Sequence, residues 1–190
     1  MVDLDEVMVS TNLILLPEFN RITGKQYTID DWTDYDICSL YGITAADYYK
    51  AFDDVEAALH AQPKQNSLSG IQMLISNGIT PVFITARRTT GLDPKRTAEW
   101  LTRYGVSTDN LHIIGSQCKG EYMLSLSNMY HFVGAVDDCL YNIAGIRKHM
   151  PSVPLFLMDC PHNRETTELA DEYIRVSCMV EVARILEGTL

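Results

Sequence analysis

The sequence predicts an α/β fold with three layers: a doubly wound parallel sheet with a small helical cap inserted after the first strand. Three observations support this fold class. From residue 79 onward, short apolar runs alternate with amphipathic helical segments. The apolar runs are not interrupted by polar residues, which is typical of parallel strands covered by helices on both faces. Residues 16–66 lack this rhythm and show helices and turns instead.

The chain begins with the end of a strand at residues 1–4. Further strands are expected at 80–84, 111–114, 132–136, 153–158 and 173–176. The intervening helices are expected at 67–77, 94–104, 119–127, 141–149 and 178–187, with Asp93 and Ser177 as N-caps of the second and the last. Because a β-α-β-α order gives right-handed crossovers, the sheet should be parallel. We assign residues 1–15 and 67–190 to a core domain and 16–66 to the cap.

The composition fits one compact domain with an insertion. Of 190 residues, 46% are hydrophobic and 21% charged, close to the averages for globular proteins. The net charge of −10 argues against binding to a long nucleic acid. A single phosphate is not excluded, because a metal ion or a few placed cations can capture it locally.

The cysteines and the N-terminal residues indicate the cellular compartment in which the protein is expected. The five cysteines form no C-x-x-C pair, which favours a reducing compartment. The first residues lack the basic segment of a signal peptide, and no apolar run is long enough for a transmembrane helix. We therefore expect a cytoplasmic protein without membrane contact, and a homo-oligomer is left open.

Polar residues follow the predicted strands. In open parallel sheets the carboxyl ends of the strands form the binding crevice. The residues at these ends are Asp3, Asp5, Thr85, Lys119, Asp137 and Asp138. Three carboxylates can hold Mg²⁺, and the metal and the lysine can then neutralise a phosphate. One carboxylate free of other duties can attack phosphorus, while a second, two residues on, protonates the leaving oxygen. This set therefore predicts phosphoryl transfer from a monoester.

The segments Asp3-Leu4-Asp5, Ile84-Thr85, Lys119 and Asp137-Asp138 resemble the four ordered motifs of haloacid dehalogenase (HAD) superfamily phosphatases. The resemblance spans almost the whole chain and implies a HAD-like Rossmannoid core. Within the superfamily, residues 83–87, residues 136–138 followed by Asn142, and residues 160–164 look like the 5'(3')-deoxyribonucleotidase family. That family carries a small helical cap between its first two motifs, where residues 16–66 lie.

The resemblance implies a role for each motif residue. Asp3 matches the nucleophile, and Asp5 matches the general acid/base that also offers its backbone carbonyl to Mg²⁺. The phosphate-binding residues are Thr85, Ala86, Arg87 and Lys119. Asp138 matches the direct metal ligand and Asp137 its supporting neighbour, so the expected metal set is Asp3, Asp5, Asp137 and Asp138.

Two features depart from the family pattern. Only Met1 and Val2 precede Asp3, so the first strand is expected to be short or to begin upstream. Glu6 stands where the superfamily usually has glycine, which adds a fourth carboxylate near the site.

The predicted cap is rich in aromatic residues, among them Trp32 beside Asp30-Asp31. Aromatic rings stack on bases, so a nucleotide is a natural occupant, although such residues more often form a core. We expect Trp32 to bind the substrate. The leading hypothesis is a Mg²⁺-dependent phosphatase of (deoxy)nucleoside monophosphates. The alternatives are a phosphatase of another small phosphoester and a catalytically silent nucleotide-binding or regulatory protein.

Overall fold

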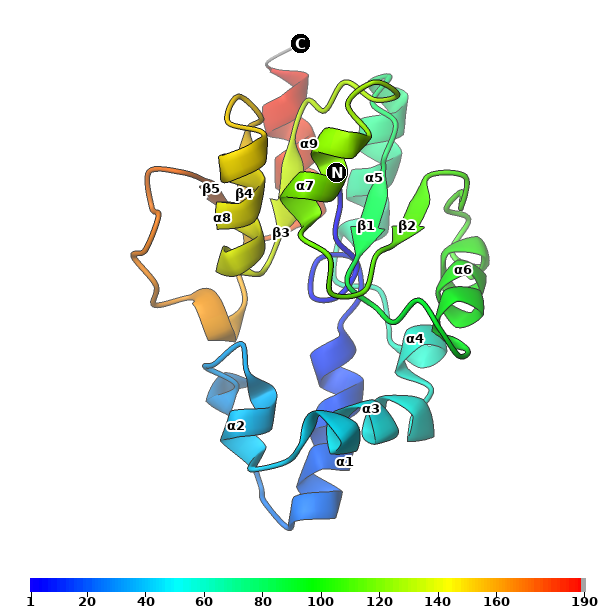
Figure 1. Ribbon diagram of the computed structural model, residues 1–190, viewed down its shortest axis with the longest axis vertical. Helices are drawn as coiled ribbons and strands as arrows, with labels where there is room; N and C mark the ends of the chain where they lie inside the picture. The colour runs from blue at the N-terminus through cyan, green and yellow to red at the C-terminus, as the bar shows by residue number, and fades with distance from the viewer. Residues whose placement is uncertain (189–190) are drawn as a thin grey trace.

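The computed structural model describes residues 1–188 and has the predicted α/β architecture (Figure 1). Strand β1 (Phe83–Thr85) pairs with β2 (Leu111–Ile113), and β3 (Ala135–Asp137) pairs with β4 (Leu155–Met158), which pairs with β5 (Ile174–Val176). Val2 forms parallel bridges to both β1 and β3. The resulting order is β2, β1, the segment around Val2, β3, β4 and β5, with every pairing parallel.

Main-chain bonds hold residues 2 and 3 between two strands of the sheet. Main-chain hydrogen bonds from Val2 N to Val82 O (2.8 Å) and from Ile84 N to Val2 O (3.1 Å) fix this segment on one side. On the other side Asp3 N donates to Val136 O at 3.1 Å. Because the segment is held between two neighbours, the Asp3 side chain emerges at the middle of the sheet's carboxyl edge.

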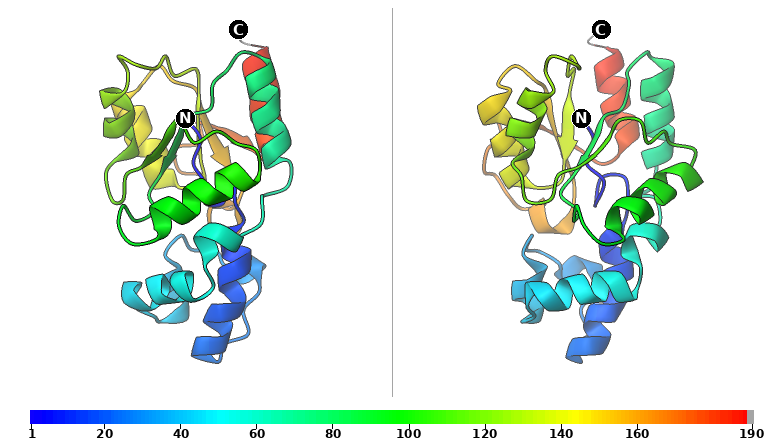
Figure 2. Two further views of the ribbon diagram at one scale, coloured as in Figure 1. Left: turned by 90° about the vertical axis from the view of Figure 1, so that its right-hand side faces the viewer. Right: turned by 45° about the vertical axis from the view of Figure 1, so that its right-hand side comes forward.

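Helices cover both faces of the sheet (Figure 2). Helices α5 (Ser67–Ser76), α6 (Asp93–Arg103) and α9 (Met179–Glu187) cover one face, and α7 (Lys119–Ser125) and α8 (Leu140–His149) cover the other. Successive strand residues enter opposite layers: Phe83, Val136 and Phe156 pack with the first group, and Ile84, Ala135 and Leu157 with the second. This two-sided burial explains why the inner strands β1, β3 and β4 are buried and mostly apolar, whereas the edge strands β2 and β5 each include a polar residue.

Helices α1 (Thr11–Thr23), α2 (Ile37–Tyr41), α3 (Ala45–Asp54) and α4 (Ala57–His60), with the 3₁₀ turn Ile29–Asp31, lie at one end of the molecule (Figure 1). They enclose a separate hydrophobic cluster that includes Phe19 and Trp32. We call these helices the cap. The proposed boundary at residue 16 falls inside α1, which begins at Thr11, and the division of the chain into core and cap stays our proposal. Within residues 1–188, no helix has the length and apolarity needed to cross a bilayer.

Two predicted helix caps are wrong. Asp93 is the first residue of α6, and its carboxylate accepts hydrogen bonds from Arg88 instead of capping the helix. Cys178 occupies the N-cap position of α9, while the Ser177 hydroxyl donates to Glu181 Oε1 at 3.0 Å. The Asp93 carboxylate is thus taken up by the guanidinium of Arg88, and the Ser177 hydroxyl is oriented toward Glu181, so neither side chain caps its helix.

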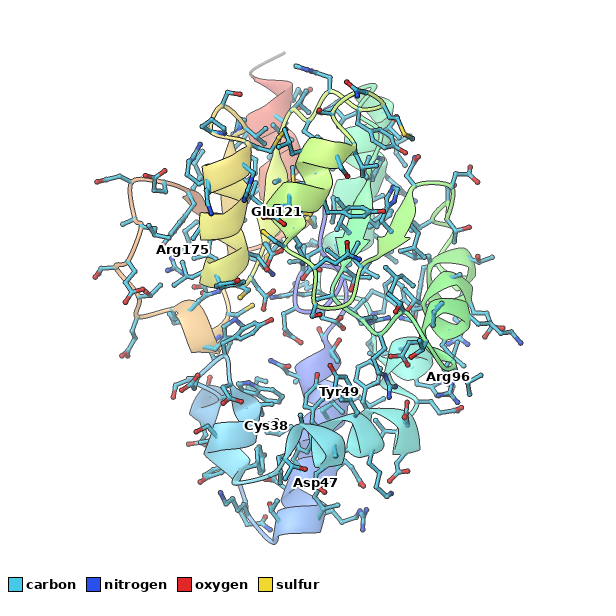
Figure 3. The ribbon with its side chains drawn as sticks, in the orientation of Figure 1. Cys38, Asp47, Tyr49, Arg96, Glu121 and Arg175 are labelled. Carbon is cyan, nitrogen blue, oxygen red and sulfur yellow. The ribbon has the colours of Figure 1, made fainter. Side chains whose placement is uncertain are left out.

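Arginines of the core tie the cap in place. Arg88 Nη1 donates to Asp53 Oδ2 of α3 at 3.1 Å, and Arg96 of α6 pairs with Glu56 beside α4. Figure 3 shows Arg96 where α6 approaches the cap, with Asp47 at the far side of the cap. Charged contacts on the surface therefore set how the cap sits on the sheet edge.

Candidate active site

A cavity of about 480 Å³ lies between the carboxyl edge of the sheet and the cap. The core contributes six of the predicted site residues to its wall: Asp3, Asp5, Thr85, Ala86, Lys119 and Asp138. Arg87 also reaches the cavity, and the cap contributes Trp32, Tyr35, Tyr48, Tyr49 and Phe52. The fold thus brings every predicted site residue to one place except Asp137, which lies directly behind the wall.

A buried lysine joins two of the carboxylates. Lys119 Nζ lies 2.6 Å from Asp3 Oδ1 and 2.7 Å from Asp137 Oδ2, and all three residues are buried. Burial raises the pKa of Asp3 well above its usual range, the charge of Lys119 opposes this, and Asp137 and Asp138 add to it. Burial alone would lower the pKa of Lys119, but the two carboxylates outweigh it and raise the pKa. Lys119 therefore remains a cation among excess negative charge.

The neighbours Asp137 and Asp138 have different surroundings. Asp137 Oδ1 accepts hydrogen bonds from Cys139 N and Asn142 Nδ2, both at 3.0 Å, while Oδ2 faces Lys119. Asp137 thus orients the segment after β3 and the Lys119 side chain. Asp138 faces the cavity, and its Oδ2 lies 3.1 Å from His162 Nε2.

The donor set fits a divalent cation. Carboxylate oxygens of Asp3, Asp137 and Asp138 lie within 4.8 Å of one another. Mg²⁺ prefers such oxygen ligands and keeps several waters. Three buried carboxylates against one lysine leave a negative charge that a bound Mg²⁺ would offset.

Asp5 forms a bidentate ion pair with Arg87. Arg87 Nε donates to Asp5 Oδ2 at 2.9 Å and Nη2 to Oδ1 at 2.8 Å, and the Thr11 hydroxyl also donates to Asp5. Burial alone would raise the pKa of Asp5, but Arg87 and Thr11 outweigh it and lower the pKa. Arg87 Nη1 also donates to Thr97 Oγ1 at 3.0 Å. The guanidinium predicted to bind phosphate is therefore engaged by Asp5 in this structure.

The end of β1 forms the side of the cavity next to Lys119. Thr85 is fully buried, and its hydroxyl oxygen accepts a hydrogen bond from Arg87 N at 3.3 Å. Ala86, the next residue, is exposed to the cavity. The hydroxyl, the following main chain and the ammonium of Lys119 thus line one part of the cavity.

Glu6 adopts the conformation that glycine favours. Its φ is 56°, in the left-handed region that most side chains avoid. Glu6 Oε1 accepts a hydrogen bond from Asn12 N at 2.7 Å near the start of α1. Burial raises the pKa of Glu6 to about 7, although the Asn12 N–H and the charge of Lys64 oppose it. The additional carboxylate therefore serves partly to join the first strand to the cap.

Sequence reasoning left His162 unassigned, yet its ring touches Asp138. Burial alone would lower the pKa of His162, but the contacts with Asp138 outweigh it and raise the pKa. The edge of the Tyr35 ring packs on His162, with centroids 5.5 Å apart. The signal in the sequence is the position of residues 160–164 directly after the fifth predicted strand, which pairs with the strand that precedes Asp138.

Trp32 combines two environments. It is only 4% exposed and packs near Phe19, with ring centroids 6.2 Å apart, but it also lines the cavity. Tyr35 and Tyr49 line the same cavity and are far more exposed. Figure 3 shows Tyr49 and Cys38 in the part of the cap that faces the core.

Buried carboxylates and a lysine thus meet at the carboxyl edge of a parallel sheet, under a group of helices. A HAD family hydrolase from Deinococcus radiodurans R1, solved with bound phosphate and sodium, superposes with a TM-score of 0.68 at 12% identity. The match covers 100% of this chain and 95% of that chain. The chain therefore has the HAD fold.

Comparison of the amino-acid sequences finds two relatives whose names give a more specific activity. The chain is 27% identical over 188 residues to "Putative nucleotidase YqfW" of Bacillus subtilis, covering 96% of this chain and 90% of the relative. It is 26% identical over 155 residues to "Putative nucleotidase BH1399" of Halalkalibacterium halodurans, covering 80% and 75%. No protein-family model matches the chain. The chain thus has the fold of HAD hydrolases and resembles in sequence two proteins named as putative nucleotidases, which agrees with the resemblance seen in its motifs.

Proposed function

We propose that the protein is a Mg²⁺-dependent phosphomonoester hydrolase that dephosphorylates (deoxy)nucleoside monophosphates through an aspartyl-phosphate on Asp3. One observation carries this proposal. The ammonium of Lys119 bridges Asp3 and Asp137 at the cavity, with Asp138 beside them. This arrangement supports a site in which Asp3 is the nucleophile and in which a cation and metal-binding oxygens surround one phosphate. The names of the two relatives support the assignment.

The chain's own residues account for both half-reactions. An oxygen of Asp3 attacks phosphorus, the ester P–O bond breaks, and the leaving oxygen takes a proton from Asp5. Because the ion pair with Arg87 lowers the pKa of Asp5, this step requires Arg87 to leave Asp5 for the phosphate, so that Asp5 can hold the proton. Water then attacks the phosphorus of the aspartyl-phosphate and gives a proton to Asp5. Phosphate leaves and the Asp3 carboxylate is restored.

The remaining polar groups position the phosphate. Lys119, the Thr85 hydroxyl and the main chain at Ala86 are available to its oxygens, and Arg87 can join them when it leaves Asp5. Asp138, Asp3 and the Asp5 carbonyl would hold Mg²⁺, with Asp137 as their support. The bound metal supplies positive charge that offsets the phosphate and the carboxylates.

The cap side of the cavity suits a nucleoside. A volume of about 480 Å³ falls in the range of small-molecule sites. Trp32 and the exposed Tyr35 and Tyr49 offer aromatic surface against which a base can stack. We propose that the base lies against these rings while the phosphate lies at the sheet edge.

The test is phosphate release from p-nitrophenyl phosphate, from 5'- and 3'-nucleotides of both sugars, and from sugar phosphates. We expect release with Mg²⁺ and none with a chelator, and a higher kcat/KM for nucleotides than for sugar phosphates. Equal or better use of sugar phosphates would favour another small phosphoester as the substrate. Tight binding of nucleotides without release from any compound would favour a silent nucleotide-binding protein.

A further inference from the structure

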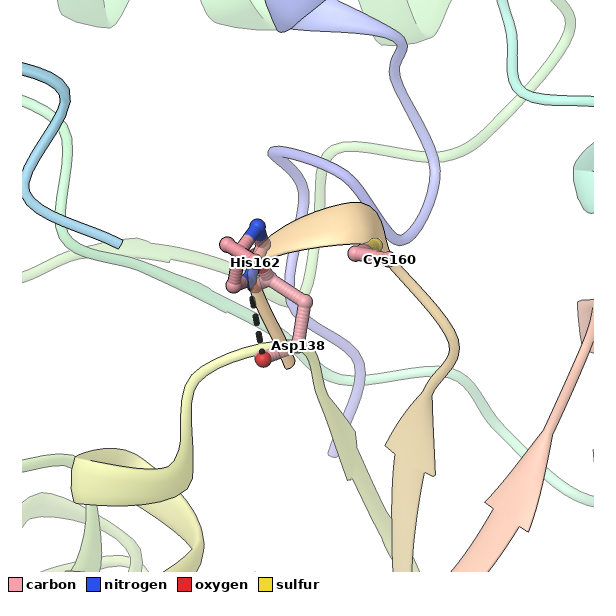
Figure 4. A group of neighbouring side chains, drawn as sticks. All are labelled: Asp138, Cys160 and His162. Atoms are coloured by element: carbon pink, nitrogen blue, oxygen red, sulfur yellow. Dashed lines mark hydrogen bonds and ion pairs between the residues drawn. The ribbon is translucent and has the colours of Figure 1, made fainter. Parts of the chain in front are cut away.

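Beside the carboxylate site lies a cluster of mixed ligand type, formed by Asp138, Cys160 and His162 (Figure 4). One carboxylate oxygen, the thiol sulfur and one imidazole nitrogen lie within 4.8 Å of one another. Asp138 follows β3, and Cys160 and His162 follow β4. Because β3 and β4 are neighbours, their carboxyl ends bring the three side chains together.

The spacing of the cluster suits a small tetrahedral metal ion. His162 Nε2 and Asp138 Oδ2 lie 3.1 Å apart. Two ligands about 2.0 Å from a tetrahedral zinc ion are separated by roughly 3.3 Å. The nitrogen and the oxygen therefore already have the spacing of two zinc ligands, and the Cys160 sulfur lies within 4.8 Å of both as the third candidate ligand.

Buried contacts hold the ligand-bearing segments in position. Asn163 Nδ2 donates to Asp138 O at 2.8 Å, and Asn163 Oδ1 accepts from Cys160 N at 3.1 Å. Lys64 Nζ lies 3.1 Å from Cys160 Sγ and can donate a hydrogen bond to the thiolate. Such outer contacts orient the residues that ligate a metal.

We propose that Asp138, Cys160 and His162 bind Zn²⁺ and that Zn²⁺ bound there inhibits hydrolysis. Sulfur and imidazole nitrogen favour Zn²⁺ over Mg²⁺, which prefers oxygen ligands alone. On binding, the thiol releases its proton to solvent and the sulfur coordinates the ion. Inhibition follows because Asp138 is then withdrawn from the Mg²⁺ site. The inhibition of hydrolysis by Zn²⁺ rests on the proposed function, whereas the binding of Zn²⁺ does not.

Binding can be tested with Co²⁺ as a spectroscopic probe for Zn²⁺ on the chelator-treated full chain. We expect a thiolate-to-cobalt charge-transfer band in the wild type that Zn²⁺ abolishes by displacement. Cys160→Ser should lose the band. Cys139→Ser, which changes another buried thiol next to Asp138, should keep it. The absence of a band in the wild type, or an unchanged band in Cys160→Ser, would overturn the zinc site.

Inhibition is measured on p-nitrophenyl phosphate at fixed Mg²⁺. The Zn²⁺ concentration for half inhibition should rise about tenfold or more in Cys160→Ser and stay unchanged in Cys139→Ser. Equal inhibition of Cys160→Ser and the wild type would refute the inhibitory role. The two readouts separate the proposals: a cobalt band without any hydrolysis supports the zinc site and refutes the proposed function. Hydrolysis without a band does the reverse.

Discussion

The core and the cap line the same cavity by different physical means. The core side consists of buried ionised groups that satisfy one another, such as Lys119 between Asp3 and Asp137. The cap side consists of aromatic rings that also form the cap's own hydrophobic cluster. Substitutions on the core side should therefore change chemistry and metal binding. Substitutions on the cap side should change stability and the choice of substrate together.

The largest effect is expected for Asp3→Asn. The amide has nearly the same size but is a poor nucleophile, so kcat should fall to about one thousandth or less. The melting temperature in metal-free buffer should not fall, because burial makes the charge of Asp3 costly. Initial rates and thermal melts measure both effects. Activity near the wild-type level would exclude Asp3 as the nucleophile.

The next comparison is within the core, between Asp138→Asn and Asp137→Asn. Asp138 faces the cavity, so its substitution should raise the Mg²⁺ concentration for half-maximal rate by about tenfold or more. Asp137 holds Lys119, Cys139 N and Asn142, so its substitution should mainly lower the melting temperature. The opposite ranking in Mg²⁺ titrations would show that Asp137 is the direct ligand.

A third experiment separates stacking from packing in the cap. Trp32→Ala should cost about 3 to 5 kcal/mol of stability, because Trp32 is almost fully buried. If the ring also stacks on the base, kcat/KM for nucleotides should fall relative to kcat/KM for p-nitrophenyl phosphate. The expected fall corresponds to the loss of about 1 to 3 kcal/mol of stacking energy. Phe19→Ala is the matched control, because Phe19 belongs to the same cluster but does not line the cavity. If the ratio of kcat/KM for nucleotides to kcat/KM for p-nitrophenyl phosphate is the same in both variants, Trp32 contributes only to packing in the cap.

The smallest effect concerns the ion pair that joins cap and core. Bonding to Arg88 lowers the pKa of Asp53 below its ordinary value of 3.8. A lowered carboxyl pKa contributes stability above 3.8, which is lost as the pH falls through the folded-state value. Because the side chain is 47% exposed, the contribution should stay below about 1 kcal/mol.

Asp53→Asn should therefore lower the melting temperature slightly at neutral pH. The difference from wild type should shrink as the pH falls below 3.8 and vanish below the lowered folded-state pKa of Asp53. Asp54→Asn is the control, because Asp54 pairs with Lys50 within α3 and not with the core. Protease cleavage of the cap should increase in Asp53→Asn alone. Equal cleavage of both variants would mean that the Arg88 contact does not anchor the cap.

The sequence by itself determined the order of strands and helices after residue 79 and the acidic pairs at the strand ends. Two-sided burial requires apolar strands, so their positions can be found from hydrophobicity alone. The carboxyl ends of parallel strands lie at one edge, so Asp3, Thr85, Lys119 and Asp138 could be placed at one cavity before any coordinates were known.

Only the tertiary structure decided which side chains form hydrogen bonds and ion pairs with one another at the cavity. The pairing of Arg87 with Asp5, and of His162 and Cys160 with Asp138, depends on which strands are neighbours and on side-chain directions within a few ångströms. Hydrophobic periodicity specifies which face of an element is buried, but it does not specify these directions. For the same reason the sequence could name Trp32 as an aromatic cap residue, while its burial against Phe19 followed only from the packing of the cap helices.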